Sequence, residues 1–144
     1  NVNFDLSHSG DYVFIGLGCE PLAVDIEVYE NGRDYTAIAK RVLTAQEHSF
    51  FVQLEKYERE WFFLKMWCLK EAYAKAIGYG LEIELGEIET RHILDKINIR
   101  GIPICLRNDN SEKWIAYALP QNPMVAGALV IQRSSFAAET AREI

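Results

Sequence analysis

Cysteine is scarce in this sequence: Cys19, Cys68 and Cys105 lie far apart, and none belongs to a CxxC pair. An odd number of widely spaced thiols argues against a disulfide framework and against a structural zinc site, and it favours a reducing cytoplasm. Long apolar runs are also absent, since no stretch approaches the roughly 18 to 20 residues that span a bilayer. We see no charged-then-apolar leader with a small-residue cleavage site, so nothing in these residues argues for secretion. We therefore expect a cytoplasmic protein without a membrane partner.

Positive charge is in deficit. Lysine and arginine number 15 against 21 aspartate and glutamate residues, which leaves a net charge of −6. This balance argues against nucleic-acid binding, and a polyanionic substrate would have to meet a local cation or a metal ion. Two catalytic signatures are missing as well. Gly16-Leu17-Gly18 lacks the rest of a dinucleotide fingerprint, and no serine or cysteine nucleophile has an adjacent base signature.

What is present is the composition of a folded domain: 144 residues, of which 49% are apolar and 25% charged, enough for one core. The pattern of short strands and helices predicts an α+β fold in which an antiparallel β-sheet packs against a long buried helix. Residues 1–133 are expected to form this domain, and residues 134–144 a polar tail. The chain opens at Asn1 inside an alternating pattern, so we expect it to be the later portion of a longer protein.

Strands are expected on both sides of a helical region. Alternating segments joined by short turns favour an antiparallel meander at residues 2–7, 12–17 and 22–27. The capping box Thr44-Ala45-Gln46-Glu47 begins the second of three helices expected at residues 35–43, 44–57 and 60–77. Segments rich in β-branched and aromatic residues predict further strands at residues 97–99, 102–106, 114–119 and 124–132.

The helix predicted at 60–77 carries the first chemical signal. Its apolar residues surround nearly the whole circumference, which is typical of a buried helix. Glu71 nevertheless lies beside Leu64 and Trp67 at helical-neighbour spacing, with Lys75 one turn further on. A carboxylate rarely enters such surroundings without a cation. The plainer alternative is a solvated Glu71–Lys75 pair at i,i+4, but the aromatic face favours a functional site.

Two further carboxylates alternate along the strand predicted at 22–27. Asp25 and Glu27 project from one face, whereas the residues between them project from the other. Carboxylates at i,i+2 lie about 7 Å apart at their Cα atoms and repel unless a positive group sits between them. Oxygen ligands suit Mg²⁺ or Mn²⁺ better than zinc. Alone, the pattern leaves open that Glu27 points into solvent; with Glu71 and Lys75 it indicates a metal site.

A third element is Ser7-His8-Ser9-Gly10 at the end of the first predicted strand. A histidine flanked by serines, with glycine following, is well placed to donate to a phosphate. Judged alone, this stretch is better explained as a turn with a half-exposed histidine. Its significance therefore depends on the other two elements.

In this order, the three elements resemble the 4′-phosphopantetheinyl transferase superfamily, in its larger type that activates peptide and polyketide synthases. The matching strings are Phe4-Asp5-Leu6-Ser7-His8-Ser9-Gly10, Val24-Asp25-Ile26-Glu27, and Trp67-Cys68-Leu69-Lys70-Glu71-Ala72-Tyr73-Ala74-Lys75-Ala76 with Gly78-Tyr79-Gly80-Leu81. The strands after Leu81 fit by position only. The resemblance implies the fold of that family, as one half of a pseudo-dimeric architecture with coenzyme A bound between two similar halves.

The resemblance also implies a role for each matching residue. Asp25, Glu27 and Glu71 would hold Mg²⁺ (or Mn²⁺) against the pyrophosphate of coenzyme A, and Glu71 would also take the proton from the attacking serine. Lys75 would neutralise the pyrophosphate as 3′,5′-ADP leaves. The remaining cofactor-binding residues would be Ser7 and His8 at the 3′-phosphate, and Lys70 on the long helix.

The implied reaction transfers 4′-phosphopantetheine from coenzyme A to a serine of an apo acyl or peptidyl carrier protein. Only the second of the two halves matches, so we expect the chain to need an N-terminal half. Two alternatives stay open. One is an inactive or partial homologue that serves as a binding domain. The other is a metal-dependent nucleotide phosphohydrolase, because a carboxylate-bound metal does not choose between water and serine as acceptor.

Overall fold

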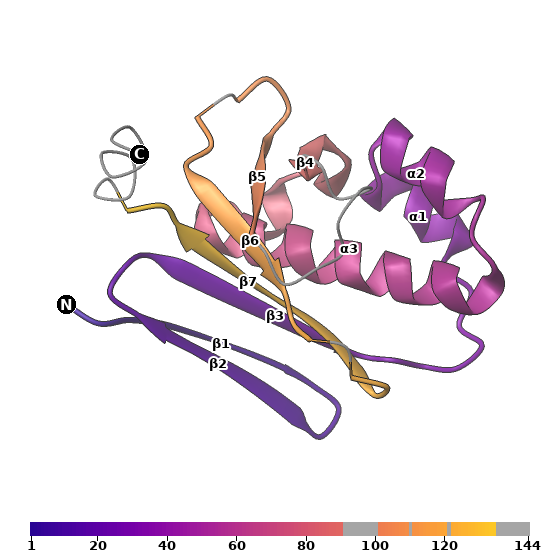
Figure 1. Cartoon of the computed structure of the whole chain (residues 1–144), viewed down its shortest axis with the longest axis horizontal. Helices are drawn as coiled ribbons and strands as arrows, with labels where there is room; N and C mark the ends of the chain where they lie inside the picture. Colours follow the sequence, from indigo (N-terminus) through magenta and orange to yellow (C-terminus); the bar gives the residue numbers. More distant parts are fainter. Residues whose placement is uncertain (91–100, 110, 121, 135–144) are drawn as a thin grey trace, which may run out of the picture.

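The computed structural model describes residues 1–90, 101–109, 111–120 and 122–134. It begins with an antiparallel hairpin of β1 (Asn3–Ser9) and β2 (Tyr12–Gly18), paired in register from Asn3↔Gly18 to Ser9↔Tyr12. Gly10 has a φ of 54° in the connecting turn, a conformation that glycine adopts without strain. The hairpin lies at one side of the molecule, along β3 (Leu22–Val28) (Figure 1).

The larger sheet has the strand order β3-β7-β6-β5-β4, and its neighbouring strands are all antiparallel. After β3 its strands are β4 (Ile88–Thr90), β5 (Ile102–Leu106), β6 (Trp114–Ala118) and β7 (Val125–Gln132). The strands predicted at 102–106, 114–119 and 124–132 are thus confirmed, and β4 is an additional strand. The strand predicted at 97–99 lies outside the described residues.

The meander expected at the start of the chain is wrong in one respect. β3 pairs with β7, from Leu22↔Ile131 to Val28↔Val125, and not with β2. Ala23, Val24 and Ile26 of β3 are almost completely buried, and β7 is a nearly continuous apolar strand. Such strands need cover on both faces, and β7 lies inside the sheet, between β3 and β6. By contrast, β1 and β2 keep a row of exposed side chains along one face.

Three α-helices lie between β3 and β4. They are α1 (Thr36–Val42), α2 (Ala45–Phe51) and α3 (Lys56–Ala76). The predicted capping box is confirmed, because Thr44 Oγ1 accepts from the Glu47 amide and Glu47 Oε2 accepts from the Thr44 amide. α2 ends earlier than predicted, and α3 begins earlier, because residues 52–55 form a turn that leaves Glu55 in an extended conformation.

The long helix α3 lies across the face of the larger sheet at β3 and β7 (Figure 1). Small buried side chains allow a close approach: Cys68 Sγ lies 3.6 Å from the Ala126 carbonyl oxygen of β7. Elsewhere the helix presents aromatic rings, and Phe63 stacks on Tyr35 with ring centroids 4.6 Å apart. The expected α+β fold, an antiparallel sheet packed against a long buried helix, is confirmed.

Along the described part of the chain, no helix is both long and apolar enough to cross a membrane. The polar tail predicted at 134–144 lies outside the described residues apart from Ser134. The division of the chain at residue 133 therefore stays a prediction.

Candidate functional site

An ion pair joins α3 to β3 at the centre of the candidate site. The Lys75 ammonium lies 2.8 Å from Asp25 Oδ1 and donates to the Val24 carbonyl at 2.9 Å. Asp25 is buried, whereas the Lys75 side chain stays 34% exposed. The second Asp25 oxygen, Oδ2, is buried without a hydrogen-bond partner. An unpartnered buried carboxylate oxygen is unusual and indicates a place for a ligand.

Glu71 lies half-buried on α3 near this ion pair. Burial raises the pKa of its carboxyl group, the charge of Asp25 raises it further, Lys75 opposes the shift and Glu27 adds to it. The three carboxylates and Lys75 thus lie within electrostatic reach of one another. The alternative of a surface pair between Glu71 and Lys75 does not describe this site, because the Lys75 ammonium is bound to β3.

The predicted Ser-His-Ser motif divides between the two faces of β1. Ser7 is buried and donates to Asp25 Oδ1 at 3.0 Å, and Ser9 donates to Glu27 Oε2 at 2.9 Å. His8 between them is exposed on the opposite face, as alternation along a strand requires. The structure therefore brings the two serines to the carboxylates and places His8 apart from them.

Lys70 does not join the other predicted cofactor-binding residues. It is completely buried, its ammonium lies 2.6 Å from Glu47 Oε2, and it donates to the carbonyls of Val42 (2.8 Å) and Leu85 (3.2 Å). Glu47 Oε1 in turn accepts from Thr90 Oγ1 at 2.8 Å. Burial lowers the pKa of Lys70, and Glu47 opposes that shift. These three acceptors match the three hydrogens of the ammonium group. Lys70 is therefore a structural residue that links α3 to other elements of the core, and its assignment to coenzyme A is corrected.

In the part of the chain that the structure describes, the Trp67 side chain of α3 lines two cavities. One, of about 240 Å³, is lined by residues that include Glu71, Ile38 and Arg41. The other, of about 110 Å³, is lined by residues that include Glu27 and again Ile38. Trp67 and Ile38 therefore line both cavities, and each cavity is also lined by a carboxylate of the site. Ile38 and Arg41 are not among the predicted site residues, because nothing in the local pattern of α1 distinguishes them from ordinary surface positions.

The oxygen atoms of this site suit a hard divalent cation. Asp25 Oδ2 is buried without a partner, and carboxylate oxygens are the ligands that Mg²⁺ and Mn²⁺ prefer. Within the described ranges, no three histidine, cysteine or acidic side chains stand close enough together to hold a metal as they are. Asp25 is thus the residue that fits a cation best, and Lys75 is the positive group that contacts it in this arrangement.

The site thus places the carboxylates of a strand beside a glutamate and a lysine of a long helix. The sequence model of the 4′-phosphopantetheinyl transferase superfamily matches residues 21–127 of the chain. The chain belongs to this superfamily. The matched segment contains Asp25, Glu27, Glu71 and Lys75, and it begins after β2.

Curated relatives match a shorter segment. The putative 4′-phosphopantetheinyl transferase of Synechocystis is 35% identical over 86 residues, which are 59% of this chain and 35% of that protein. The 4′-phosphopantetheinyl transferase Sfp of Bacillus subtilis is 31% identical over 91 residues (63% and 40%). The human L-aminoadipate-semialdehyde dehydrogenase-phosphopantetheinyl transferase is 37% identical over 101 residues (62% and 31%). The matched segment spans about a third to two fifths of the length of these relatives.

Two solved structures share the fold. One is the holo-(acyl-carrier-protein) synthase of Bacillus anthracis in complex with CoA (3′,5′-ADP), with a TM-score of 0.57 and 24% identity over 80% of this chain and 96% of that one. The other is the holo-[acyl-carrier-protein] synthase of Thermotoga maritima, with a TM-score of 0.54 and 21% identity over 78% and 64%. At these identities the likeness concerns the fold alone, and it confirms the expected family fold.

Proposed function

We propose that the protein transfers 4′-phosphopantetheine from coenzyme A to a serine of an apo acyl or peptidyl carrier protein and releases 3′,5′-ADP. The observation that supports this reaction most directly is the grouping of Asp25, Glu71 and Lys75 where α3 crosses β3, on residues within the superfamily match. The cytoplasm is the proposed compartment, because free thiols such as Cys19 and Cys68 suit a reducing environment.

Lys75 is placed to neutralise charge on the substrate. Phosphoryl transfer depends more on positioning and charge neutralisation than on covalent chemistry. An ammonium has three hydrogens, and the contacts of Lys75 with Val24 and Asp25 use two of them. The third can donate to a pyrophosphate oxygen of coenzyme A as 3′,5′-ADP leaves, without release of Asp25.

Glu71 is the proposed proton acceptor for the attacking serine. The pKa of its carboxyl group is raised and therefore lies closer to the operating pH. A general base is most effective when its pKa is near that pH. It also lines the larger cavity beside Trp67, through which a serine side chain can approach. The serine oxygen bonds to the phosphorus that carries pantetheine, its proton passes to Glu71, and the bond from that phosphorus to 3′,5′-ADP breaks.

Asp25, Glu27 and Glu71 are the residues proposed to hold Mg²⁺, or Mn²⁺ in its place. When bound, the ion would supply further positive charge for the pyrophosphate. Asp25 offers its unpartnered buried oxygen, and Glu27 is oriented by Ser9. Glu71 would complete the set from α3, since its pKa responds to both strand carboxylates.

We further propose that His8 contacts the 3′-phosphate of coenzyme A and that an N-terminal half completes this part of the pocket. The outer face of the hairpin around His8 is apolar, with side chains 50–73% exposed at Val2, Phe4, Leu6, Val13, Ile15 and Leu17. Cross-strand partners share a face, and the β1 residues among these pair with those on β2. A contiguous apolar face of this kind indicates an interface, and the curated relatives extend well beyond the matched segment.

The experiment that tests the proposed function is an intact-mass assay on an apo carrier protein. The chain, joined to the proposed N-terminal half, is incubated with coenzyme A, Mg²⁺ and the carrier, and Asp25→Ala in the same protein serves as the inactive comparison. We expect the parent to add the phosphopantetheine mass to the carrier and the variant to leave it unmodified. Release of nucleotide with no gain of mass on the carrier would indicate a phosphohydrolase. Binding of coenzyme A with neither product would indicate a binding domain.

A further inference from the structure

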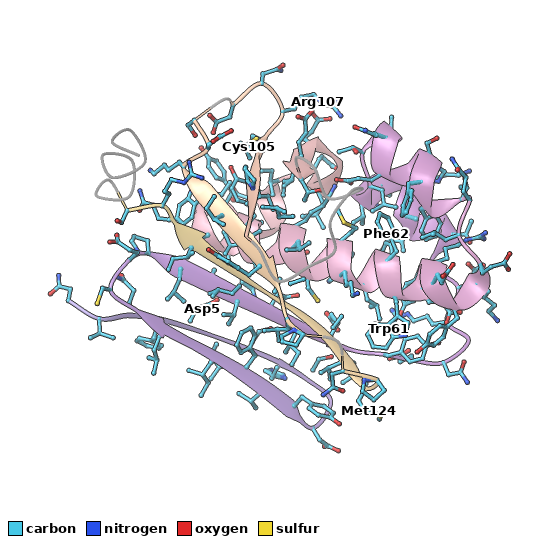
Figure 2. The ribbon with its side chains drawn as sticks, in the orientation of Figure 1. Asp5, Trp61, Phe62, Cys105, Arg107 and Met124 are labelled. Atoms are coloured by element: carbon cyan, nitrogen blue, oxygen red, sulfur yellow. The ribbon has the colours of Figure 1, made fainter. Side chains whose placement is uncertain are left out.

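The hairpin is attached to β3 by side chains rather than by a backbone ladder. Three alternate amides of β3, those of Val24, Ile26 and Val28, donate to side-chain oxygens of Asp5 (2.8 Å), Ser7 (3.3 Å) and Ser9 (3.1 Å) respectively. Each pair is 19 residues apart in the sequence, so β1 runs parallel to β3. Figure 2 shows Asp5 on the side of β1 that faces β3. The contacts form a row in which every second residue of β1 meets every second residue of β3.

Ser7 and Ser9 make a second contact that Asp5 does not make. The Ser7 hydroxyl accepts from the Ile26 amide and donates to Asp25, the residue before it. The Ser9 hydroxyl likewise accepts from the Val28 amide and donates to Glu27, the residue before Val28. A hydroxyl has a single hydrogen. Because the amide occupies an acceptor position, that hydrogen is directed at the carboxylate.

This arrangement sets the orientation of a carboxylate. Ser7 and Lys75 both hold Oδ1 of Asp25, which leaves the buried Oδ2 as the oxygen without a partner. A short carboxylate held through one oxygen cannot turn without breaking these contacts. The other oxygen therefore keeps a defined direction before any ion arrives.

We propose that Ser7 and Ser9 are positioning residues that orient Asp25 and Glu27 for a divalent cation. This inference rests on the proposed function, which assigns those carboxylates to the cation. It gives Ser7 a role different from the direct phosphate contact that the sequence predicts. Groups that hydrogen-bond to metal ligands typically change metal affinity by about 10- to 100-fold when they are removed, so the effect is large enough to measure.

The first measurement establishes the row of contacts without any metal. Amide hydrogen exchange is compared in the parent chain, Ser7→Ala, Ser9→Ala and the control Ser111→Ala, whose hydroxyl lies in an exposed segment. Ser7→Ala should accelerate exchange of the Ile26 amide, and Ser9→Ala that of Val28. The Val24 amide, held by Asp5, should keep the parent rate. Unchanged exchange in both alanine variants would overturn the proposal at its structural basis.

The second measurement separates positioning from simple attachment of the hairpin. Binding of Mn²⁺ alone is followed through the paramagnetic resonance signal of the free ion. Ser7→Ala and Ser9→Ala should each bind Mn²⁺ about 10-fold more weakly. Ser7→Thr and Ser9→Thr, which keep the hydroxyl, should recover most of the loss, and Ser111→Ala should bind like the parent. If Ser7→Ala fails to fold, the partly exposed Ser9 carries the same comparison.

The outcomes distinguish this proposal from the proposed function. Parent-like Mn²⁺ affinity in both alanine variants would overturn the positioning role and leave the serines as attachments between strands. No Mn²⁺ binding by the parent would overturn the metal assignment together with this inference. The expected Mn²⁺ pattern in a chain that never modifies a carrier protein would support the positioning role and overturn the transferase function alone.

Discussion

Lys70 and Glu71 are neighbours in the sequence, yet Lys70 forms a buried ion pair with Glu47 at 2.6 Å while Glu71 lines a cavity. Successive residues of an α-helix point about 100° apart. The Lys70 side chain points into the core between α2 and β4, whereas the Glu71 side chain points toward the candidate site. The two charged residues of one motif therefore have different surroundings: Lys70 is paired in the core, and Glu71 faces the cavity where the proposed function places the chemistry.

Removal of Lys70 should destabilise the fold. Lys70→Met leaves Glu47 as an uncompensated buried charge, for which we expect a loss of about 3 to 5 kcal/mol in the free energy of unfolding. Urea denaturation measures it. Lys65→Met is the matched control, because Lys65 lies on the same helix and is only partly buried. Parent-like stability combined with a raised KM for coenzyme A would return Lys70 to the substrate site.

Asp25→Ala should abolish transfer while the fold persists. We expect at least about a 100-fold loss of kcat, the scale found when one group that stabilises developing charge is removed. Lys75 would lose its partner but remain partly exposed to water, so the melting temperature should change little. Glu27→Ala should reduce turnover less, because water can replace a partly exposed carboxylate. Full activity of Asp25→Ala would contradict the metal assignment.

Glu71 should make stability depend on pH. Because burial and the charge of Asp25 raise its pKa, the folded state binds this proton more tightly than the unfolded state. That contribution favours folding below the ordinary pKa and is lost as the pH rises through the raised value. Glu71→Gln should therefore be more stable than the parent near neutral pH, by at most about 1 kcal/mol for a half-buried group that solvent screens.

The advantage of Glu71→Gln should disappear in acid, and melting curves of both proteins across the pH range would show the convergence. Its transferase activity should be lost at every pH, because an amide cannot accept the serine proton. A variant less stable than the parent at neutral pH would show that the charged carboxylate is favoured in the folded state.

His8 should act on one phosphate of the substrate. Coenzyme A carries a 3′-phosphate that dephospho-coenzyme A lacks. If His8 donates to it, His8→Ala should weaken the use of coenzyme A by roughly 1.5 to 3 kcal/mol, the range for a charge-assisted hydrogen bond. The loss should appear mainly in KM, and dephospho-coenzyme A should be almost unaffected. Equal losses with both substrates would mean that His8 acts through the local fold of β1.

Local interactions account for what the sequence alone predicted well. The capping box at Thr44 and Glu47 involves residues three apart, and it is present in the structure. The alternation along β3 and the apolar circumference of α3 are also properties of short segments, so the local sequence is sufficient to predict both. The order of the three motifs was sufficient to indicate the superfamily that the match at residues 21–127 confirms.

Which distant groups meet depends on the packing of the whole chain. The pairing of β3 with β7, the ion pair of Lys75 with Asp25 and the burial of Lys70 against Glu47 join residues that lie far apart in the chain. No local pattern encodes such partners. Each of them depends on how the long helix packs on the sheet and on which charged groups that packing removes from water. Local sequence patterns therefore predict most of the elements and the chemical groups, whereas packing places Lys70 in the core and brings Ser7 to the Asp25 carboxylate.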